Sequence, residues 1–182
     1  MSAYLVLVLA VLSRLLPHAI HAVGINLTAT GGSLLFFGAR RSRWQAIFAV
    51  LAFAATDFYL TVYAFHYPFH AKAYLVTWVW YAAVCLVGSQ LLRTRATFLR
   101  TGTAVLASAT SFFILVDFAV WAGQGLYPHT LAGLMACYVA AIPFYANDIV
   151  STAITAGALF GLPVLATRIA ENLRTPAREN LS

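Results

Sequence analysis

Residues 3–26, AYLVLVLAVLSRLLPHAIHAVGIN, decide what kind of fold this chain can form, because an apolar run leads directly into a polar cluster. The run predicts a membrane helix over residues 3–22, since a helix that crosses a hydrocarbon layer of ~30 Å needs about 20 mostly apolar residues. Ionisable groups at membrane depth cost about 2.5–3.5 kcal/mol each on insertion scales, so they normally pair or line a wet cavity. Four polar side chains follow one another here: Arg14, His18, His21 and Asn26.

The cluster has the spacing of one helix face. Arg14, His18 and His21 are four and three residues apart, so they share a face if the helix continues past Pro17. Pro17 removes one backbone hydrogen bond and predicts a kink at that point. The sequence therefore predicts a polar helix end rather than a plain apolar anchor.

The composition of the whole chain points to a membrane protein. Its 182 residues are 62% hydrophobic and 9% charged, which is more apolar surface than a soluble domain of this size can bury. The net charge of +6 is spread over the ends of the apolar runs rather than gathered on one face. We therefore expect the lipid bilayer as a partner and no nucleic acid.

Apolar runs separated by short polar breaks predict an all-α bundle of six transmembrane helices. They cover residues 3–22, 27–39, 44–64, 74–92, 101–123 and 148–167. Residues 130–146 are apolar but contain Pro143, and we expect them to form a packed or re-entrant outer cap, with a seventh span as the alternative. The sequence therefore predicts one membrane domain over 1–170 and a polar cytoplasmic tail over 171–182.

The basic residues orient this bundle. With six spans, nine of the eleven basic residues fall on one side: Arg40, Arg41, Arg43, Arg93, Arg95, Arg100, Arg168, Arg174 and Arg178. The positive-inside rule makes that side the cytoplasm, with both termini inside, and predicts a multi-pass protein of the inner cell membrane. All five histidines then lie on the outer side: His18, His21, His66, His70 and His129.

Three acidic residues, Asp57, Asp117 and Asp148, are also predicted to lie in the outer half of the membrane. Two interpretations of these charged groups are open. Arg14 can form an internal ion pair with Asp57 or Asp117 that only clamps helices. Alternatively, these groups line a polar pocket that opens outward and binds a ligand. The candidate ligand-binding residues are Arg14, His18, His21, Asn26, Asp57, His66, His70, Asp117, Trp121, His129, Asn147 and Asp148.

Two further patterns carry narrower predictions. His18 and His70 are candidates for metal ligands, although no compact motif such as HExxH accompanies them. Ala153, Gly157 and Gly161 recur every four residues and predict a seam for close helix packing.

Two stretches resemble a family of small bacterial membrane proteins of unknown function. The first stretch is residues 13–39, SRLLPHAIHAVGINLTATGGSLLFFGA. It matches the family pattern in its Arg-x-x-Pro-His motif, in Asn26 and in the LLFFGA run. It departs from that pattern in the inserted residues AIHAVGI and in Ala29. In FFILVDFAVWAGQGLYPHTLAGLMACYVAAIPFYAND, residues 112–148, the LYPHTLAGL and AIPF segments match.

By size and helix count, that family is similar to the S components of energy-coupling-factor (ECF) transporters. The similarity implies that a vitamin, corrinoid or metal is captured from outside, with cobalamin, haem or a divalent metal as ligand and no required cofactor. His70 would then be a candidate axial contact to cobalt. The Ala-x-x-x-Ala pairs that S components use for docking lack a clean counterpart here, so the partner is either an ECF energising module or none, as for a solitary S component.

Three functions are therefore expected in descending order. The first is a substrate-binding or transport protein that captures a small solute. The second is a structural or accessory subunit of a membrane complex, held by internal ion pairs. The third is a haem- or metal-dependent membrane enzyme, but no nucleophile elbow, phosphate-binding loop or paired-cysteine motif occurs, and we do not expect an enzyme.

Overall fold

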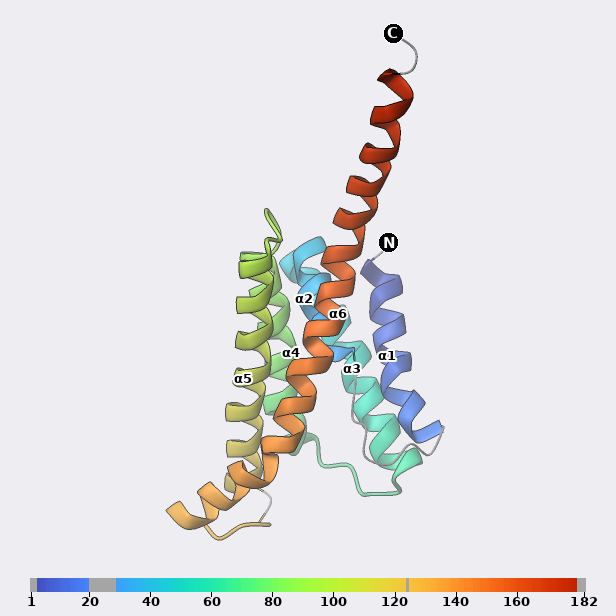
Figure 1. Cartoon of the computed structure of the whole chain (residues 1–182). Coiled ribbons are helices and arrows are strands. Elements are labelled where there is room, and N and C mark those ends of the chain that lie inside the picture. The colour runs from blue at the N-terminus through green and yellow to red at the C-terminus, as the bar shows by residue number, and fades with distance from the viewer. Residues whose placement is uncertain (1–2, 20–28, 124, 180–182) are drawn as a thin grey trace.

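The computed structural model describes residues 3–19, 29–123 and 125–179, with side chains described for 3–15, 29–123 and 125–172. This part of the chain forms six α-helices in the order α1 Ala3–Ala19, α2 Thr30–Arg40, α3 Ala46–Tyr59, α4 Ala71–Leu91, α5 Phe98–Gly123 and α6 Leu131–Glu179. A 3₁₀ turn, Arg43–Gln45, precedes α3, and a π-helical turn, Leu60–Ala64, follows it. Successive helices run in opposite directions (Figure 1).

Helix α2 lies at the centre of the bundle and contacts each of the other five helices. Every residue from Thr30 to Ala39 is buried, so this helix faces protein on all sides. Its glycines explain how the neighbours come so close. A Cβ on Gly38 would collide with the carbonyl oxygen of Cys85 in α4, and one on Gly88 of α4 would collide with the carbonyl oxygen of Leu35. The two backbones therefore touch directly.

The outer surface of the bundle is apolar. Leu51 of α3 is 58% exposed and Val79 of α4 is 69% exposed. Many other large hydrophobic side chains are also exposed. Four helical segments of the described chain are long and apolar enough to cross a membrane: Arg43–Ala64, Ala71–Leu91, Phe98–Gly123 and Leu131–Asn172. These segments and this surface indicate a membrane protein.

The all-helical fold predicted from the sequence is confirmed, and the second predicted span requires a correction. Helix α2 has 11 residues, which at about 1.5 Å per residue gives roughly 16 Å, about half of a ~30 Å hydrocarbon layer. It is therefore a core helix and too short to be a complete span over 27–39. Hydropathy alone does not separate a buried core helix from a lipid-facing one.

The alternative of a separate seventh span is wrong, because residues 131–146 are continuous with the predicted last span. These residues begin α6, a continuous helix of 49 residues that also contains the predicted last span and continues through most of the predicted polar tail. Figure 1 shows the first part of α6, in light orange, at an angle to the rest. Pro143 lies within the helix, where a proline removes one backbone hydrogen bond and can bend a helix without ending it.

The small-residue seam predicted on α6 does not pack within the described chain. Ala153, Gly157 and Gly161 are exposed, and a Cβ on either glycine would meet nothing within 4 Å. The neighbouring face packs instead, where Ala156 is fully buried and the ring of Phe160 lies 5.3 Å from that of Phe36 in α2.

The two ends of the bundle differ in their polar residues. The connections that follow α2 and α4 lie at the same end as the two termini, whereas those that follow α3 and α5 lie at the other end (Figure 1). The first end carries the clustered arginines, and the second carries His66, His70 and His129.

The close approach of α2 and α4 predicts how glycine substitutions behave. We expect Gly38→Ala to destabilise the protein by about 1–3 kcal/mol, because the new methyl group cannot fit against a backbone carbonyl. Gly157→Ala is the matched control, since its methyl group enters open space, and it should leave stability unchanged or slightly raised. Thermal unfolding of the detergent-solubilised variants measures both. Equal behaviour of the two variants would contradict the α2–α4 contact.

Candidate functional site

An internal ion pair joins the ends of α1 and α3. Arg14 Nη2 donates to Asp57 Oδ1 at 2.6 Å, and the Asp57 side chain is 3% exposed. Of the two ion pairs considered from the sequence, the structure contains the one with Asp57. Pairing of this kind explains how both charges are tolerated inside an apolar bundle.

Helix α4 completes this polar network. Trp78 Nε1 donates to Asp57 Oδ2 at 3.0 Å, and Tyr81 Oη donates to the same oxygen at 3.5 Å. Arg14 Nη1 in turn donates to Tyr81 Oη at 3.3 Å. Both carboxylate oxygens of Asp57 are therefore occupied within the protein, which makes Asp57 a structural group more than a free ligand-binding one. Sequence reasoning missed Trp78 and Tyr81, although their spacing of three residues places them on one helix face.

A small polar cavity lies beside this network. It has a volume of about 170 Å³ and is lined by Arg14, Thr30, Trp80, Tyr81, Phe112, Phe144 and Asp148. Two buried oxygen atoms, Thr30 Oγ1 and Asp148 Oδ2, find no hydrogen-bond partner among the residues that the structure describes. The other carboxylate oxygen of Asp148 accepts a long bond, 3.4 Å, from Thr152 Oγ1. We call this space the Asp148 cavity.

A larger cavity of about 720 Å³ lies at the start of α4. Its polar lining comes from Thr61, Tyr67, His70, Lys72, Tyr74 and Thr77, and its apolar lining includes residues of α5 such as Val116 and Val120. No Asp or Glu is among the described residues that line it. We call it the Lys72 cavity.

Tyr74, which lines the Lys72 cavity, belongs to a stack of aromatic rings. The rings of Phe69 and Tyr74 stack at 5.1 Å, and those of Tyr74 and Trp78 stack at 6.2 Å. The hydroxyls of Tyr74 and Thr61 are 2.7 Å apart. Because Trp78 also donates to Asp57, this stack connects the Lys72 cavity to the ion-pair network.

Other predicted site residues do not line either of these two cavities. Asp117 lines an adjoining cavity of about 240 Å³ between α5 and α6, which shares Phe112 and Phe144 with the Asp148 cavity. Trp121 Nε1 donates to the carbonyl oxygen of Pro128, and the ring of His129 meets that of Trp121 edge-on at 5.5 Å. Asn147 is partly buried on α6. The predicted single pocket is thus divided among several places.

The remaining predicted histidines do not form a shared centre in the described structure. His66 is exposed at a residue with a positive φ of 57°, and His70 lies in the Lys72 cavity. His18 belongs to α1, but its side chain, together with His21 and Asn26, lies outside the described residues. Among described side chains, no group of three or more His, Cys, Asp or Glu could hold a metal ion.

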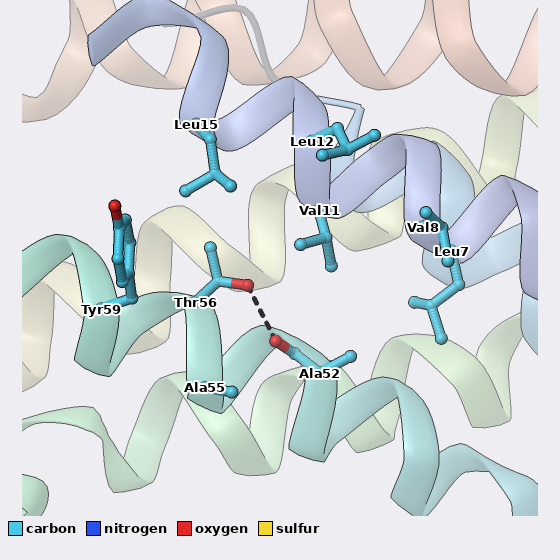
Figure 2. A pocket seen from close by; sticks show the side chains of 9 residues that line it. All are labelled: Leu7, Val8, Val11, Leu12, Leu15, Ala52, Ala55, Thr56 and Tyr59. Carbon is cyan, nitrogen blue, oxygen red and sulfur yellow. Dashed lines mark hydrogen bonds between the residues drawn. The ribbon is translucent and has the colours of Figure 1, made fainter. Parts of the chain in front are cut away.

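A groove between α1 and α3 differs from the Lys72 and Asp148 cavities because its lining is apolar. Its volume is about 400 Å³, and its lining is almost entirely aliphatic, from Leu7 to Leu15 on α1 and from Ala52 to Tyr59 on α3. Figure 2 shows that the Thr56 hydroxyl in this groove is bonded back to the carbonyl oxygen of Ala52 in its own helix. The groove therefore presents the kind of surface that acyl chains cover, and we do not treat it as a polar ligand site.

One comparison with known proteins gives a match. The family model of DUF6580, a family of unknown function, matches residues 1–174. No curated protein and no solved structure matches the chain. The matched range includes every residue that lines the Lys72 and Asp148 cavities.

The network around Asp57 predicts how substitutions combine. Either Arg14→Leu or Asp57→Leu alone should cost about 3–5 kcal/mol of stability, because each leaves one buried charge without its partner. The double variant Arg14→Leu/Asp57→Leu should recover much of that loss. Thermal unfolding in detergent measures all three.

Arg14→Leu/Asp117→Leu is the matched control, since the structure pairs Arg14 with Asp57. Recovery in this control, or none in the Asp57 double variant, would contradict the assigned pair.

Proposed function

The chain belongs to DUF6580, a family of unknown function, and we propose that it is a membrane protein that binds a small organic anion in the Lys72 cavity as a solute-capture or transport component. The observation that carries this proposal is a cavity of about 720 Å³ with a cationic lining and no described acidic lining residue. Its size falls within the ~300–1,000 Å³ typical of small-molecule sites.

Electrostatics at the start of α4 favour an anion. Lys72 lies in the first turn of α4, which contains no acidic residue, and no side chain caps the helix at His70. A cation at a helix N-terminus opposes the helix dipole by about 0.3–1 kcal/mol, and the first backbone N–H groups lack helical acceptors. A bound carboxylate or phosphate would offset both effects.

The remainder of the cavity favours an organic molecule over a bare ion. Val116 and Val120 offer apolar contact, and the paired hydroxyls of Tyr74 and Thr61 offer polar contact. An amphipathic anion of vitamin size would use all of these features. This proposal retains the S-component-like role expected from the sequence, working with an ECF energising module or alone, and it involves no chemical conversion of the solute.

We also propose the inner cell membrane as the location, with both termini in the cytoplasm. The arginines that follow α2 and α4, and those near the end of α6, support this orientation through the positive-inside rule. The Lys72 cavity would then open toward the outer side.

A second candidate is a structural or accessory subunit of a membrane complex. The Arg14–Asp57 pair favours it, because both groups are fully engaged inside the protein. Under this alternative the protein would co-purify with stoichiometric membrane partners after gentle solubilisation, and no small solute would stabilise it.

Ligand binding predicts a thermal shift that depends on Lys72. Purified protein in detergent should be stabilised by at least one member of a panel of vitamin-sized carboxylates and phosphates, by about 2.7 kcal/mol at a ligand concentration 100 times Kd. The corresponding neutral amides should have little effect. Lys72→Gln should fold normally, since Lys72 is exposed, and should lose most of the shift.

Arg95→Gln is the matched control, because Arg95 is an exposed cation in the connection after α4, at the opposite end of the bundle. Its response should equal that of the wild type. The proposal fails if no anion stabilises the wild type, or if the two variants respond alike.

The orientation can be tested with reporter fusions. A reporter that is active only in the cytoplasm should be active at the C-terminus and inactive when inserted between residues 125 and 130. A reporter that is active only outside should give the reverse pattern, and the opposite pair of results would overturn the proposed topology.

A further inference from the structure

The Asp148 cavity is a second polar space, distinct from the Lys72 cavity. At about 170 Å³ it is smaller than a typical organic-ligand site, although it has room for a few water molecules at about 30 Å³ each. Thr30 is only 8% exposed, yet its hydroxyl, like Asp148 Oδ2, has no partner among the described residues. Buried polar groups are normally hydrogen-bonded, so two unpartnered oxygens in one cavity indicate that something binds there.

Among the described residues, the charges around the cavity do not balance. Arg14 is already paired with Asp57 at 2.6 Å, so an ionised Asp148 would be a net negative charge. The other lining groups are Thr30 on α2, Trp80 and Tyr81 on α4, Phe112 on α5 and Phe144 on α6, none of which supplies a further cation. An unpaired carboxylate in such surroundings costs several kcal/mol. The cavity therefore favours one bound positive charge.

A proton fits this cavity better than a metal ion does. A metal such as Ca²⁺ takes 6–8 oxygen ligands, whereas the free oxygens here are Thr30 Oγ1 and Asp148 Oδ2. A proton needs only one carboxylate oxygen, and a neutral carboxyl group can donate to a hydroxyl or to water.

We propose that Asp148 is a proton-binding site and that its carboxyl group is protonated in the state described by this structure. Loss of the proton passes H⁺ to water in the cavity and leaves a carboxylate that competes with Asp57 for Arg14. One protonation event at α6 thus controls the strength of the clamp between α1 and α3. This inference stands independently of the solute proposed for the Lys72 cavity.

Infrared difference spectroscopy on lipid-reconstituted protein tests the site directly. Across a pH titration the wild type should show the stretching band of a protonated carboxyl group at neutral pH and lose it at higher pH. The band should be absent in Asp148→Asn and shifted in Thr30→Val, which removes the unpartnered hydroxyl while keeping the shape of the side chain.

Asp117→Asn is the matched control, because Asp117 lines a different cavity, and it should retain the Asp148 band. Asp148→Asn should also keep a thermal midpoint close to that of the wild type, since asparagine resembles the neutral acid. The proposal is overturned if the wild type lacks the band at neutral pH, if the band survives Asp148→Asn, or if Asp148→Asn prevents folding while Asp117→Asn does not.

Discussion

The contact between the backbones of α2 and α4 is the constraint on which the rest of the structure depends. Gly38 and Gly88 bring the two helices together without intervening side chains. Because α2 is buried along its length and contacts every other helix, it fixes where α4 and α6 stand. Trp78 and Tyr81 project from α4 to Asp57, and Thr30 at the start of α2 lines the Asp148 cavity. A glycine contact with no chemistry of its own thus positions the polar groups.

The three acids inside the bundle have different surroundings, and this difference separates their roles. Asp57 is bonded to a cation, an indole N–H and a phenol, so it holds three helices together. Asp148 has one oxygen without a partner and no described ion pair. Asp117 lines an adjoining cavity that contains neither of the other two acids. In an apolar medium the number of available partners decides whether a carboxyl group serves structure or exchanges a proton.

Sequence reasoning predicted an all-helical chain with long apolar segments, because the apolar runs can be read directly along the sequence. It also narrowed the partner of Arg14 to two acids. It could not place Asp57, Asp117 and Asp148 relative to one another, since residues at equal depth can face different directions around their helix axes. The continuity of α6 was missed because Pro143 and Pro128 look alike in sequence, while only surrounding contacts decide whether a helix bends or stops.

A chain of contacts joins the two cavities, and it constrains how they could work together. Tyr74 lines the Lys72 cavity and stacks on Trp78. Trp78 donates a hydrogen bond to Asp57. Asp57 in turn pairs with Arg14, which lines the Asp148 cavity. If a solute shifts Tyr74, the hydrogen bond from the Trp78 indole to Asp57 changes, and with it the strength of the Arg14–Asp57 ion pair. By linkage, protonation of Asp148 must then alter solute affinity by the same factor that the solute alters proton affinity. Such coupling would require two discrete arrangements of the Arg14 side chain. A chain of neighbouring contacts does not by itself couple two binding sites, because both sites must shift the same two-state equilibrium.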